Sequence, residues 1–356
     1  MRLLIQHPHA EGEISGVLSS VNELLPALAA RSGVQPQVFS SKHAGWREQW
    51  RAVEGCDAVM LNSNCFGLML FARLLGRRSV LKLHYPQYQT VHWQYTPMPF
   101  RQRLVAELRH LWGLDTNARY LAASVGRLGM RTVVALLAHR VCACSRFCAE
   151  QASLPRRVHV LKNPLAVQRG LPPRTLEQLD GPLRFVFVGR LSDEKGWDTL
   201  LDAAQDLKAS GRGFVVDIVG DGPDRARLEA RIIAGHLAKH VRTLGRLAPA
   251  EVRPRLAGAL AAVVPSRVQE QAGYVAVEAA SEQVASIVSR AGGLPETAGV
   301  ACPSFDVGDA TQLMQHMAGF IDDPLKALAA GRVAYLTACD EFDPGRIAEG
   351  LLALLR

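Results

Sequence analysis

Short apolar segments of strand length alternate with longer amphipathic segments along the first half of the chain. Strands are predicted at residues 2–6, 38–41, 58–62, 79–84 and 158–161. Helices are predicted between them at 17–31 and 65–75, and over most of residues 100–140. Strands that alternate with helices predict a parallel sheet with helices on both faces.

A polar segment rich in proline and glycine, residues 168–182, separates this half from a second series of the same kind. Its strands are predicted at 183–188, 214–219, 241–244, 261–264 and 286–288, and its helices at 197–209, 226–238, 274–280, 310–321, 324–340 and 346–356. A chain of 356 residues is too long for one ordinary core. We therefore predict an α/β fold with two Rossmann-like domains that face a cleft, residues 1–167 and 168–340, and a last segment, 341–356, that packs back on the first domain.

The composition is that of an enzyme-sized globular protein, with 48% hydrophobic and 21% charged residues. No apolar run reaches the roughly 18 residues needed to span a bilayer, and the first residues lack the pattern of a signal peptide. The seven cysteines are irregularly spaced, which favours reduced thiols and a cytoplasmic location. Their one cluster, Cys142, Cys144 and Cys148, could be a metal site, but the pattern favours a buried strand that ends in a turn.

Positive charge is concentrated in the first half. Residues 1–165 contain 20 Lys and Arg against 9 Asp and Glu, whereas the remainder contains 21 against 24. This balance indicates an anionic partner, such as a membrane surface, a phosphorylated acceptor or nucleic acid; solvated arginines on helix faces are the other interpretation. No clustered basic run or known binding module supports nucleic acid. The arginines of residues 100–140 could instead bring the first domain to the inner face of an anionic membrane.

Two glutamates in the second half, Glu270 and Glu278, flank a predicted helix start at Tyr274. Gly273 precedes that helix, and a helix N-terminus offers unpaired N–H groups and a positive dipole end that hold phosphate. Carboxylates on both sides of a phosphate site suit a ligand with an anionic middle and hydroxyl-rich ends. A nucleotide sugar has this shape.

A glycine and two cations follow the first strand of the second half: Gly189, Arg190 and Lys195. At the carboxyl end of a strand they would hold phosphate oxygens, although two surface cations beside a turn would give the same pattern. Gly220 opens a second turn, GDGP, but Arg225 stands where a dinucleotide-binding fingerprint needs its third glycine. This disfavours a nicotinamide or flavin enzyme.

In order along the chain, GRLSDEKG, GDGP and PSRVQEQAGYVAVEA ending in SRAGGLPE resemble the donor domain of the family 4 retaining glycosyltransferases, which have the GT-B fold. The resemblance is strong over residues 183–300 and weaker over the first half. It implies a hexosyltransferase that uses a UDP- or GDP-linked sugar without a cofactor. The sequence contains no Asp-x-Asp motif, so a metal ion that bridges the diphosphate is not indicated.

The resemblance also assigns roles to individual residues. It implies that Arg190 and Lys195 bind the donor diphosphate, that Glu278 bonds the ribose, and that Glu270 orients the transferred sugar. Further donor-binding residues implied by it are Gly16, Gly189, Gly220, Gly273, Tyr274 and Val275. His84 corresponds to a histidine near the sugar and acceptor, although a lone histidine is often structural. Glu270, His84, Lys195 and Arg190 are the expected catalytic residues.

The acceptor is expected to bind a polar aromatic loop after His84. Its candidate residues are Tyr85, Tyr88, His92 and Trp93, whose rings could stack on a sugar; a lid or a packed connection would have the same composition. Ala272, Gln283 and Ala285 depart from the family pattern, which has Phe, Gly and Pro there. Another GT-B enzyme, such as an epimerase or a phosphorylase, and a non-catalytic partner subunit are the alternatives.

Overall fold

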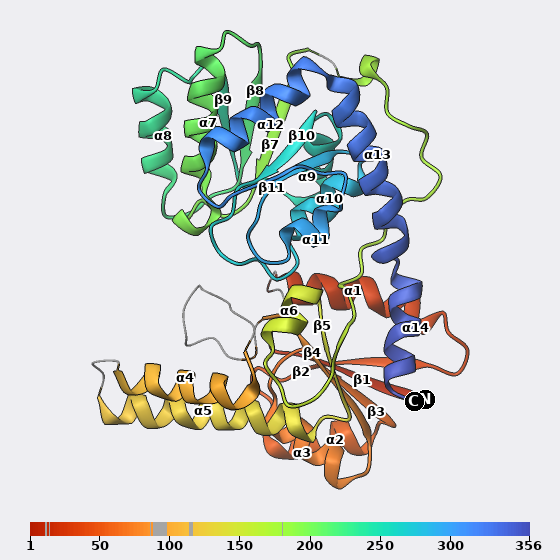
Figure 1. Ribbon diagram of the computed structural model, residues 1–356. Helices are drawn as coiled ribbons and strands as arrows, with labels where there is room; N and C mark the ends of the chain where they lie inside the picture. The colour runs from red at the N-terminus through yellow and green to blue at the C-terminus, as the bar shows by residue number, and fades with distance from the viewer. Residues whose placement is uncertain (11–12, 14, 86, 88–97, 114–116, 180) are drawn as a thin grey trace. The chain divides into compact units, whose positions relative to one another are not determined.

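The computed structural model describes residues 1–10, 13, 15–85, 87, 98–113, 117–179 and 181–356 (Figure 1). The chain forms two compact units, each with its own parallel sheet. The first unit is Met1–Ala166 together with Phe342–Arg356, and the second is Val167–Glu341.

The sheet of the first unit has the strand order β2-β1-β3-β4-β5-β6 in the described residues. Its strands are β1 (Arg2–His7), β2 (Gln35–Ser40), β3 (Ala58–Leu61), β4 (Arg78–Leu83), β5 (Arg140–Ala143) and β6 (Val158–Val160). All five pairings are parallel. The strand order reverses beside β1, because β2 lies on one side of it and β3 on the other.

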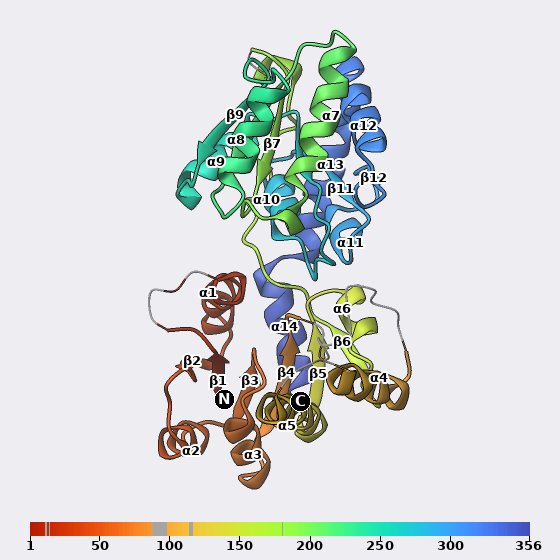
Figure 2. The same ribbon diagram turned by 90° about the vertical axis from the view of Figure 1, so that its left-hand side faces the viewer.

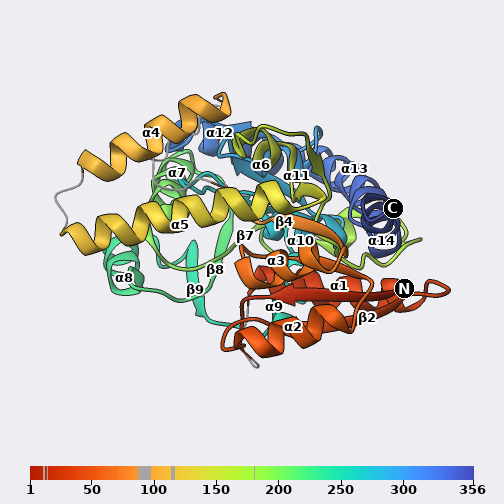
Figure 3. The ribbon, with the colours of Figure 1, turned by 90° about the horizontal axis from the view of Figure 1, so that it is seen from below.

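Helices cover both faces of this sheet (Figure 2). They are α1 (Gly16–Ala29), α2 (Trp46–Glu54), α3 (Phe66–Leu74), α4 (Phe100–Gly113), α5 (Ala118–Leu137), α6 (Arg146–Gln151) and α14 (Pro344–Leu354). Helix α1 packs against α14, whereas α3 packs against both α2 and α5. Helices α4 and α5 lie side by side, as Figure 3 also shows.

Helix α14 brings the end of the chain into the core of the first unit. Ile347, Leu351 and Leu355 recur every four residues and are buried, so they form one stripe on the helix. This stripe packs with Leu24 and Leu28 of α1 and with the apolar side chains of the sheet. The last helix therefore completes a layer that α1 begins.

The sheet of the second unit has the order β12-β11-β10-β7-β8-β9 in the described residues. Its strands are β7 (Arg184–Val188), β8 (Val215–Val219), β9 (Val241–Gly245), β10 (Ala261–Val264), β11 (Ala285–Ser289) and β12 (Ser304–Phe305). All pairings are again parallel.

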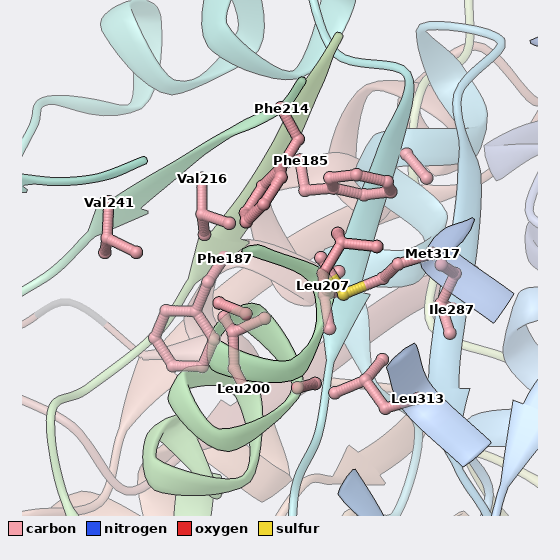
Figure 4. Packing of buried hydrophobic residues seen from close by; sticks show 14 of the residues in the cluster. Phe185, Phe187, Leu200, Leu207, Phe214, Val216, Val241, Ile287, Leu313 and Met317 are labelled. Atoms are coloured by element: carbon pink, nitrogen blue, oxygen red, sulfur yellow. The ribbon is translucent and has the colours of Figure 1, made fainter. Parts of the chain in front are cut away.

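The helices of the second unit form two groups. They are α7 (Trp197–Ala209), α8 (Arg225–Ala234), α9 (Pro249–Ala257), α10 (Tyr274–Ser281), α11 (Leu294–Ala298), α12 (Ala310–Asp322) and α13 (Pro324–Glu341), with short 3₁₀ turns at η1 (Leu176–Gln178) and η2 (Asp193–Lys195). Helix α7 contacts α8 and α12, and α10 contacts α9, α11 and α13. Phe185, Phe187 and Phe214 pack with Leu200, Leu207 and Leu313 in the larger core cluster (Figure 4).

The predicted α/β fold with two Rossmann-like units is confirmed. Helix α7 has the predicted bounds. Cys142, the first residue of the cysteine cluster, lies in the strand β5, and Ser145 after it caps helix α6. Helices α2 and α9 were not predicted from the sequence. Val53 is the one buried residue of α2, so no apolar stripe marks it, and α9 contains Pro254, which normally disfavours a helix interior.

Candidate active site

The strand order of the second sheet reverses beside β7. The chain continues from β7 to β8 and β9 on one side, and from β10 to β11 and β12 on the other. Because crossovers between parallel strands are right-handed, the helices that follow β7 and β10 lie on opposite faces, and the loops that lead to them diverge. Open parallel sheets bind ligands at such a point, beyond the carboxyl ends of the strands.

Lys195 and Glu270 come from these two loops and meet at this point. Lys195 Nζ donates to Glu270 Oε1 at 2.5 Å, and Ser266 Oγ donates to the same oxygen at 2.9 Å. The two charged side chains are 27% and 21% exposed. A pair that is half-buried but reaches solvent can exchange one partner for a charged ligand without leaving a buried charge unpaired.

Backbone bonds join the loop that carries Lys195 to the loop that carries Glu270. The N–H groups of Arg267 and Val268 both donate to the carbonyl of Glu194, at 2.8 and 3.2 Å. The Arg267 guanidinium adds ion pairs to Asp193 at 3.1 Å and to Asp198 at 2.6 Å. The positions of Lys195 and Glu270 are therefore set by the main chain as well as by their own contact.

Two glycines allow the loops to approach this closely. Gly196 follows Lys195 with φ of +66°, and a Cβ there would lie 1.9 Å from the carbonyl oxygen of Pro265. Gly292, with φ of +66°, forms a parallel bridge with Glu270, and a Cβ there would lie 2.3 Å from the Glu270 carbonyl oxygen. Glycine is required at both positions, because other residues would meet backbone atoms and strained φ values.

Helix α10 begins beside Glu270 with Gly273 as its N-cap. Its first turn closes with a hydrogen bond of 3.0 Å from Ala276 N to the Gly273 carbonyl, so the N–H of Val275 precedes the hydrogen-bond ladder of the helix. Tyr274 is the first helical residue, and Glu278 lies on the second turn. Burial raises the pKa of Glu278, opposed by the charge of Arg253. Within the described residues its carboxylate has no hydrogen bond or ion pair, so its acceptor capacity is open to a ligand.

Arg190 and the glycines of the first two turns lie at the carboxyl ends of β7 and β8. The exposed guanidinium of Arg190 makes no ion pair in the part of the chain that the structure describes. Gly189 N donates to Val219 O at 3.0 Å, and Gly220 N donates to Gly245 O at 2.8 Å. The GDGP turn also supports the loop that carries Arg190, because Leu191 N donates to Asp221 O at 3.0 Å.

His84 lies in the first unit, directly after β4. Its Nε2 is 2.8 Å from Asn62 Oδ1, while Asn62 Nδ2 donates to the Gln6 carbonyl at 2.9 Å. Because the Asn62 amide thereby presents its oxygen to His84, Nε2 carries the proton and Nδ1 is left as an acceptor. Burial, with smaller contributions from the charges of Lys82 and His9, lowers the pKa of His84 well below its ordinary value of 6.5. The imidazole is therefore neutral near pH 7.

His84 and Tyr85 line a hollow of about 770 Å³ at the carboxyl ends of β1, β3 and β4, which we call the first-unit hollow. It lies where the order of the first sheet reverses beside β1, as expected for a ligand site. Gly16 is the first residue of α1, after the cap residue Ser15. Tyr88, His92 and Trp93, predicted to bind the acceptor, lie outside the described residues.

The departures from the family pattern have distinct surroundings. Gln283 has φ of +58°, a conformation that favours glycine. Its side chain donates to Pro172 O at 2.8 Å and accepts from Arg332 at 3.0 Å, which holds the strained residue in place. Ala285 is a buried residue of β11, and Ala272 lies half-buried just before Gly273.

Sequence reasoning did not find four residues that position the candidate groups. Ser266 bonds Glu270, Arg267 joins the two loops, and Asn62 with Gln6 orients His84. Ser266 and Arg267 lie two and three residues after the end of β10, which is a signal for a site position, but the residues that they contact are distant in sequence. The contact between Asn62 and His84 could not be predicted from the sequence, because it depends on the order of the strands in the sheet.

Two units, each with a parallel six-stranded sheet covered by helices, are typical of the GT-B architecture. The fold resembles that of the Anabaena protein Alr3699/HepE, solved in complex with UDP, with a TM-score of 0.72 and 16% identity over 99% of each chain. A structure of the same protein with UDP-glucose has a TM-score of 0.69 and 17% identity, over 100% of this chain and 99% of that one.

The family model "Glycosyl transferases group 1" matches residues 174–335. The chain is 31% identical to 2-deoxystreptamine glucosyltransferase of Streptomyces kanamyceticus over 281 residues, 77% of this chain and 71% of that protein. It is 30% identical to glycogen synthase of Mycobacterium tuberculosis over 200 residues, 55% of this chain but 45% of that protein. The chain belongs to the glycosyl transferases group 1, and it is a glycosyltransferase of the hexosyltransferase type.

Replacing Gly196 by alanine tests how the two loops are held together. We expect Gly196→Ala to destabilise the second unit by roughly 3 kcal/mol or more, because both the left-handed backbone and the contact with Pro265 O become unfavourable. Gly211→Ala is the matched control, since Gly211 has φ of +77° with no atom near its Cβ position, and we expect a cost of about 1 kcal/mol. Urea unfolding of the wild type and of both variants, followed by circular dichroism, measures the two costs. Equal costs would contradict the close approach.

The neutral state of His84 predicts a pH dependence of stability. Because the pKa of His84 is lowered in the folded state, His84 is protonated below about pH 6.5 in the unfolded chain but stays neutral in the folded chain. The contribution of neutral His84 to the free energy of unfolding is complete above about pH 6.5. It falls as the pH falls toward the folded-state pKa, by at most about 1.4 kcal/mol per pH unit. His84→Gln should remove this slope in urea unfolding between pH 7.5 and 5.5, whereas the exposed His43→Gln should keep it. Parallel profiles for wild type and His84→Gln would contradict the assignment.

Proposed function

We propose that the protein transfers a sugar from a nucleoside diphosphate sugar to an acceptor hydroxyl, with retention of anomeric configuration and without a metal ion. The observation that carries this proposal is the Lys195–Glu270 pair beyond β7 and β10, beside the start of α10. It offers a cation, a carboxylate and helix N–H groups at one switch point. The UDP-glucose bound by the Anabaena protein of the same fold supports a UDP-linked donor.

The donor would be held by charged groups that are already positioned in the site. Lys195 turns from Glu270 to the diphosphate, and the exposed guanidinium of Arg190 adds a bidentate contact. Glu270, still bonded by Ser266 Oγ, is then able to accept hydrogen bonds from the hydroxyls of the transferred sugar. Glu278, whose carboxylate has unused acceptor capacity, bonds the ribose hydroxyls.

The transfer itself requires few protein groups. The acceptor oxygen bonds to the anomeric carbon on the face from which the leaving phosphate departs, and the C–O bond to phosphate breaks. The acceptor proton passes to the leaving phosphate oxygen, so the nucleoside diphosphate leaves with that proton. Lys195, Arg190 and the α10 N-terminus stabilise the charge that grows on the phosphate. Neutral His84, with Nδ1 as an acceptor, orients a hydroxyl of the sugar or the acceptor.

Substitution of Lys195 tests the electrostatic part of this proposal. We expect Lys195→Ala to lower kcat by roughly 10²- to 10³-fold, the usual effect of removing one charge-stabilising group from a transition state. Release of UDP from UDP-glucose, followed with an acceptor mixture, measures the rate. The exposed Lys239→Ala is the control and should behave as wild type. An unchanged rate for Lys195→Ala would overturn the role assigned to this residue.

The same assay addresses metal independence and retention. We expect full activity in excess EDTA, because protein cations supply the charge that a divalent ion would otherwise supply. The anomeric proton of the glycoside product, observed by NMR, should show the configuration that the donor has. Loss of activity restored by Mg²⁺, or an inverted product, would contradict these parts of the proposal.

We further propose that the enzyme works in the cytoplasm, in peripheral contact with the inner face of an anionic membrane. Support comes from α4 and α5, whose exposed residues include Val105, Leu108, Trp112, Val125 and Val133 beside Arg101, Arg109 and Arg119. The one acid in the described parts of these helices, Glu107, is buried beside Arg103. Helix α5 is the one described helix long and apolar enough to cross a membrane, and only 22% of its apolar window is buried. Because it packs on α3 and leads into β5, an interfacial position suits it better.

Vesicle sedimentation tests the membrane contact. Wild type should co-sediment with vesicles that contain 30% phosphatidylglycerol and not with pure phosphatidylcholine, and binding should weaken as salt rises. Trp112→Ser should reduce binding several-fold, because Trp112 is 79% exposed on α4. Ile233→Ser removes a similarly exposed apolar residue from the second unit and should have no effect. Binding that does not depend on anionic lipid would remove the proposal.

A further inference from the structure

Helix α2 presents two tryptophans on one side. Trp46 and Trp50 lie one turn apart, and each contacts the ring of Phe71 on α3 at a steep angle, with ring centroids 5.5 and 5.1 Å apart. Trp46 is nevertheless 59% exposed, and Val53 is the one buried residue of α2. A tryptophan that only packed two helices together would be largely buried, since its ring removes a large apolar area from water. The packing of α2 on α3 therefore leaves much of this aromatic surface unused.

A groove of about 430 Å³ lies beside these rings, and we call it the α2 groove. Its described lining is Trp46, Arg47, Trp50, Arg51 and Phe71, with no acid. Both arginines are exposed, and their guanidinium groups make no hydrogen bond or ion pair in the described chain. Because a guanidinium group carries several N–H donors and no acceptor, the groove combines ring surfaces with unused hydrogen-bond donors.

The α2 groove adjoins the first-unit hollow at Trp46. This residue lines both, because it begins α2 and thus lies near the carboxyl edge of the sheet, where the hollow is. Trp50, one helical turn further along α2, lines the groove but is not among the described residues that line the hollow. A chain-like ligand that extends from His84 past Trp46 therefore meets Trp50 next.

Sugar rings match the two kinds of group in the α2 groove. A pyranose ring carries C–H groups that pack on the face of an indole ring, and hydroxyl groups that accept hydrogen bonds from guanidinium N–H groups. An anionic lipid surface matches the groove less well, because Glu48 and Glu54 are exposed on the same helix and would be repelled. On α4 and α5, by contrast, the one described acid is buried. The α2 groove is therefore better suited to a saccharide than to a membrane.

We propose that the acceptor is a saccharide of two or more units, which the first-unit hollow and the α2 groove bind together. The receiving unit lies in the hollow, and the next unit stacks on Trp46 and Trp50 in the groove. Arg47 and Arg51 donate hydrogen bonds to the hydroxyls of that second unit. The inference rests on the proposed transferase function and narrows the acceptor from any hydroxyl compound to an oligosaccharide or a longer glycan.

Calorimetric titration of the whole protein with saccharides of increasing length tests this inference. The panel holds the mono-, di- and tetrasaccharides of glucose, galactose, mannose, N-acetylglucosamine and glucuronic acid. In at least one series the tetrasaccharide should bind saturably and roughly fivefold or more tightly than the monosaccharide, which is the effect of one aromatic stacking contact. Trp50→Ala should remove this gain, and Trp50→Phe, which keeps a ring, should retain part of it. Trp112→Ser removes an exposed tryptophan from α4 and should leave the gain unchanged.

Arg51→Met is a second variant that does not depend on the packing of rings. Because this side chain is exposed, the variant should fold as the wild type does and bind the same tetrasaccharide severalfold more weakly, since hydrogen bonds to a charged donor are lost. Arg73→Met removes an exposed arginine of α3 outside the described lining of the groove and should bind as the wild type does. No gain with length in any series, or the full gain in both Trp50→Ala and Arg51→Met, would overturn the inference.

Two parallel measurements separate a failure of this inference from a failure of the other proposals. If no nucleoside diphosphate sugar binds the wild type, the proposed function is contradicted, while a gain with length that requires Trp50 still supports the saccharide groove. Sedimentation with anionic vesicles should be the same for Trp50→Ala and the wild type. Loss of sedimentation in Trp50→Ala would assign the groove to a lipid surface and overturn the inference.

Discussion

The reversal of strand order beside β7 is the constraint on which the candidate site depends. It makes β7 and β10 neighbours, with the loops that follow them at the same edge of the sheet, so that residues 75 positions apart in sequence, Lys195 and Glu270, meet at 2.5 Å. The backbone bonds from Arg267 and Val268 to the Glu194 carbonyl then fix the two loops to each other. The first sheet has the same reversal beside β1, and its hollow with His84 lies there. One topological rule thus places candidate ligand groups in both units.

The Lys195–Glu270 pair also explains how a site for a charged ligand remains stable when empty. A half-buried cation without a partner would be unfavourable, and so would a half-buried carboxylate. Each neutralises the other, and in the proposed function a diphosphate replaces Glu270 as the partner of Lys195 while Ser266 continues to bond the carboxylate.

The fold class followed from the alternation of strand and helix patterns, and helix α7 was predicted with the bounds it has. Elements without an apolar stripe, such as α2, were missed, because burial of a single residue leaves no period to detect. The motif residues Lys195 and Glu270 could be proposed from their positions after strands, but their pairing could not, since it depends on the order of the strands in the sheet. The supporting contacts of Arg267 and Asn62 are long-range for the same reason. Gln283 shows the converse: its positive φ was unexpected for a non-glycine residue, and two side-chain bonds from distant segments stabilise it.

The central claim is that a nucleotide sugar binds beyond β7 and β10, with its ribose at Glu278. Calorimetric titration of the wild type, Glu278→Ala and Glu282→Ala with UDP-glucose measures this most directly. Glu282 is the matched control, because it follows α10 and pairs with Arg253. The account predicts one saturable site in the wild type and in Glu282→Ala, and binding roughly tenfold weaker or more in Glu278→Ala, since hydrogen bonds to a charged group contribute about 1.5–3 kcal/mol. Equal affinities in all three proteins, or no binding of UDP-glucose or any other nucleoside diphosphate sugar, would contradict it.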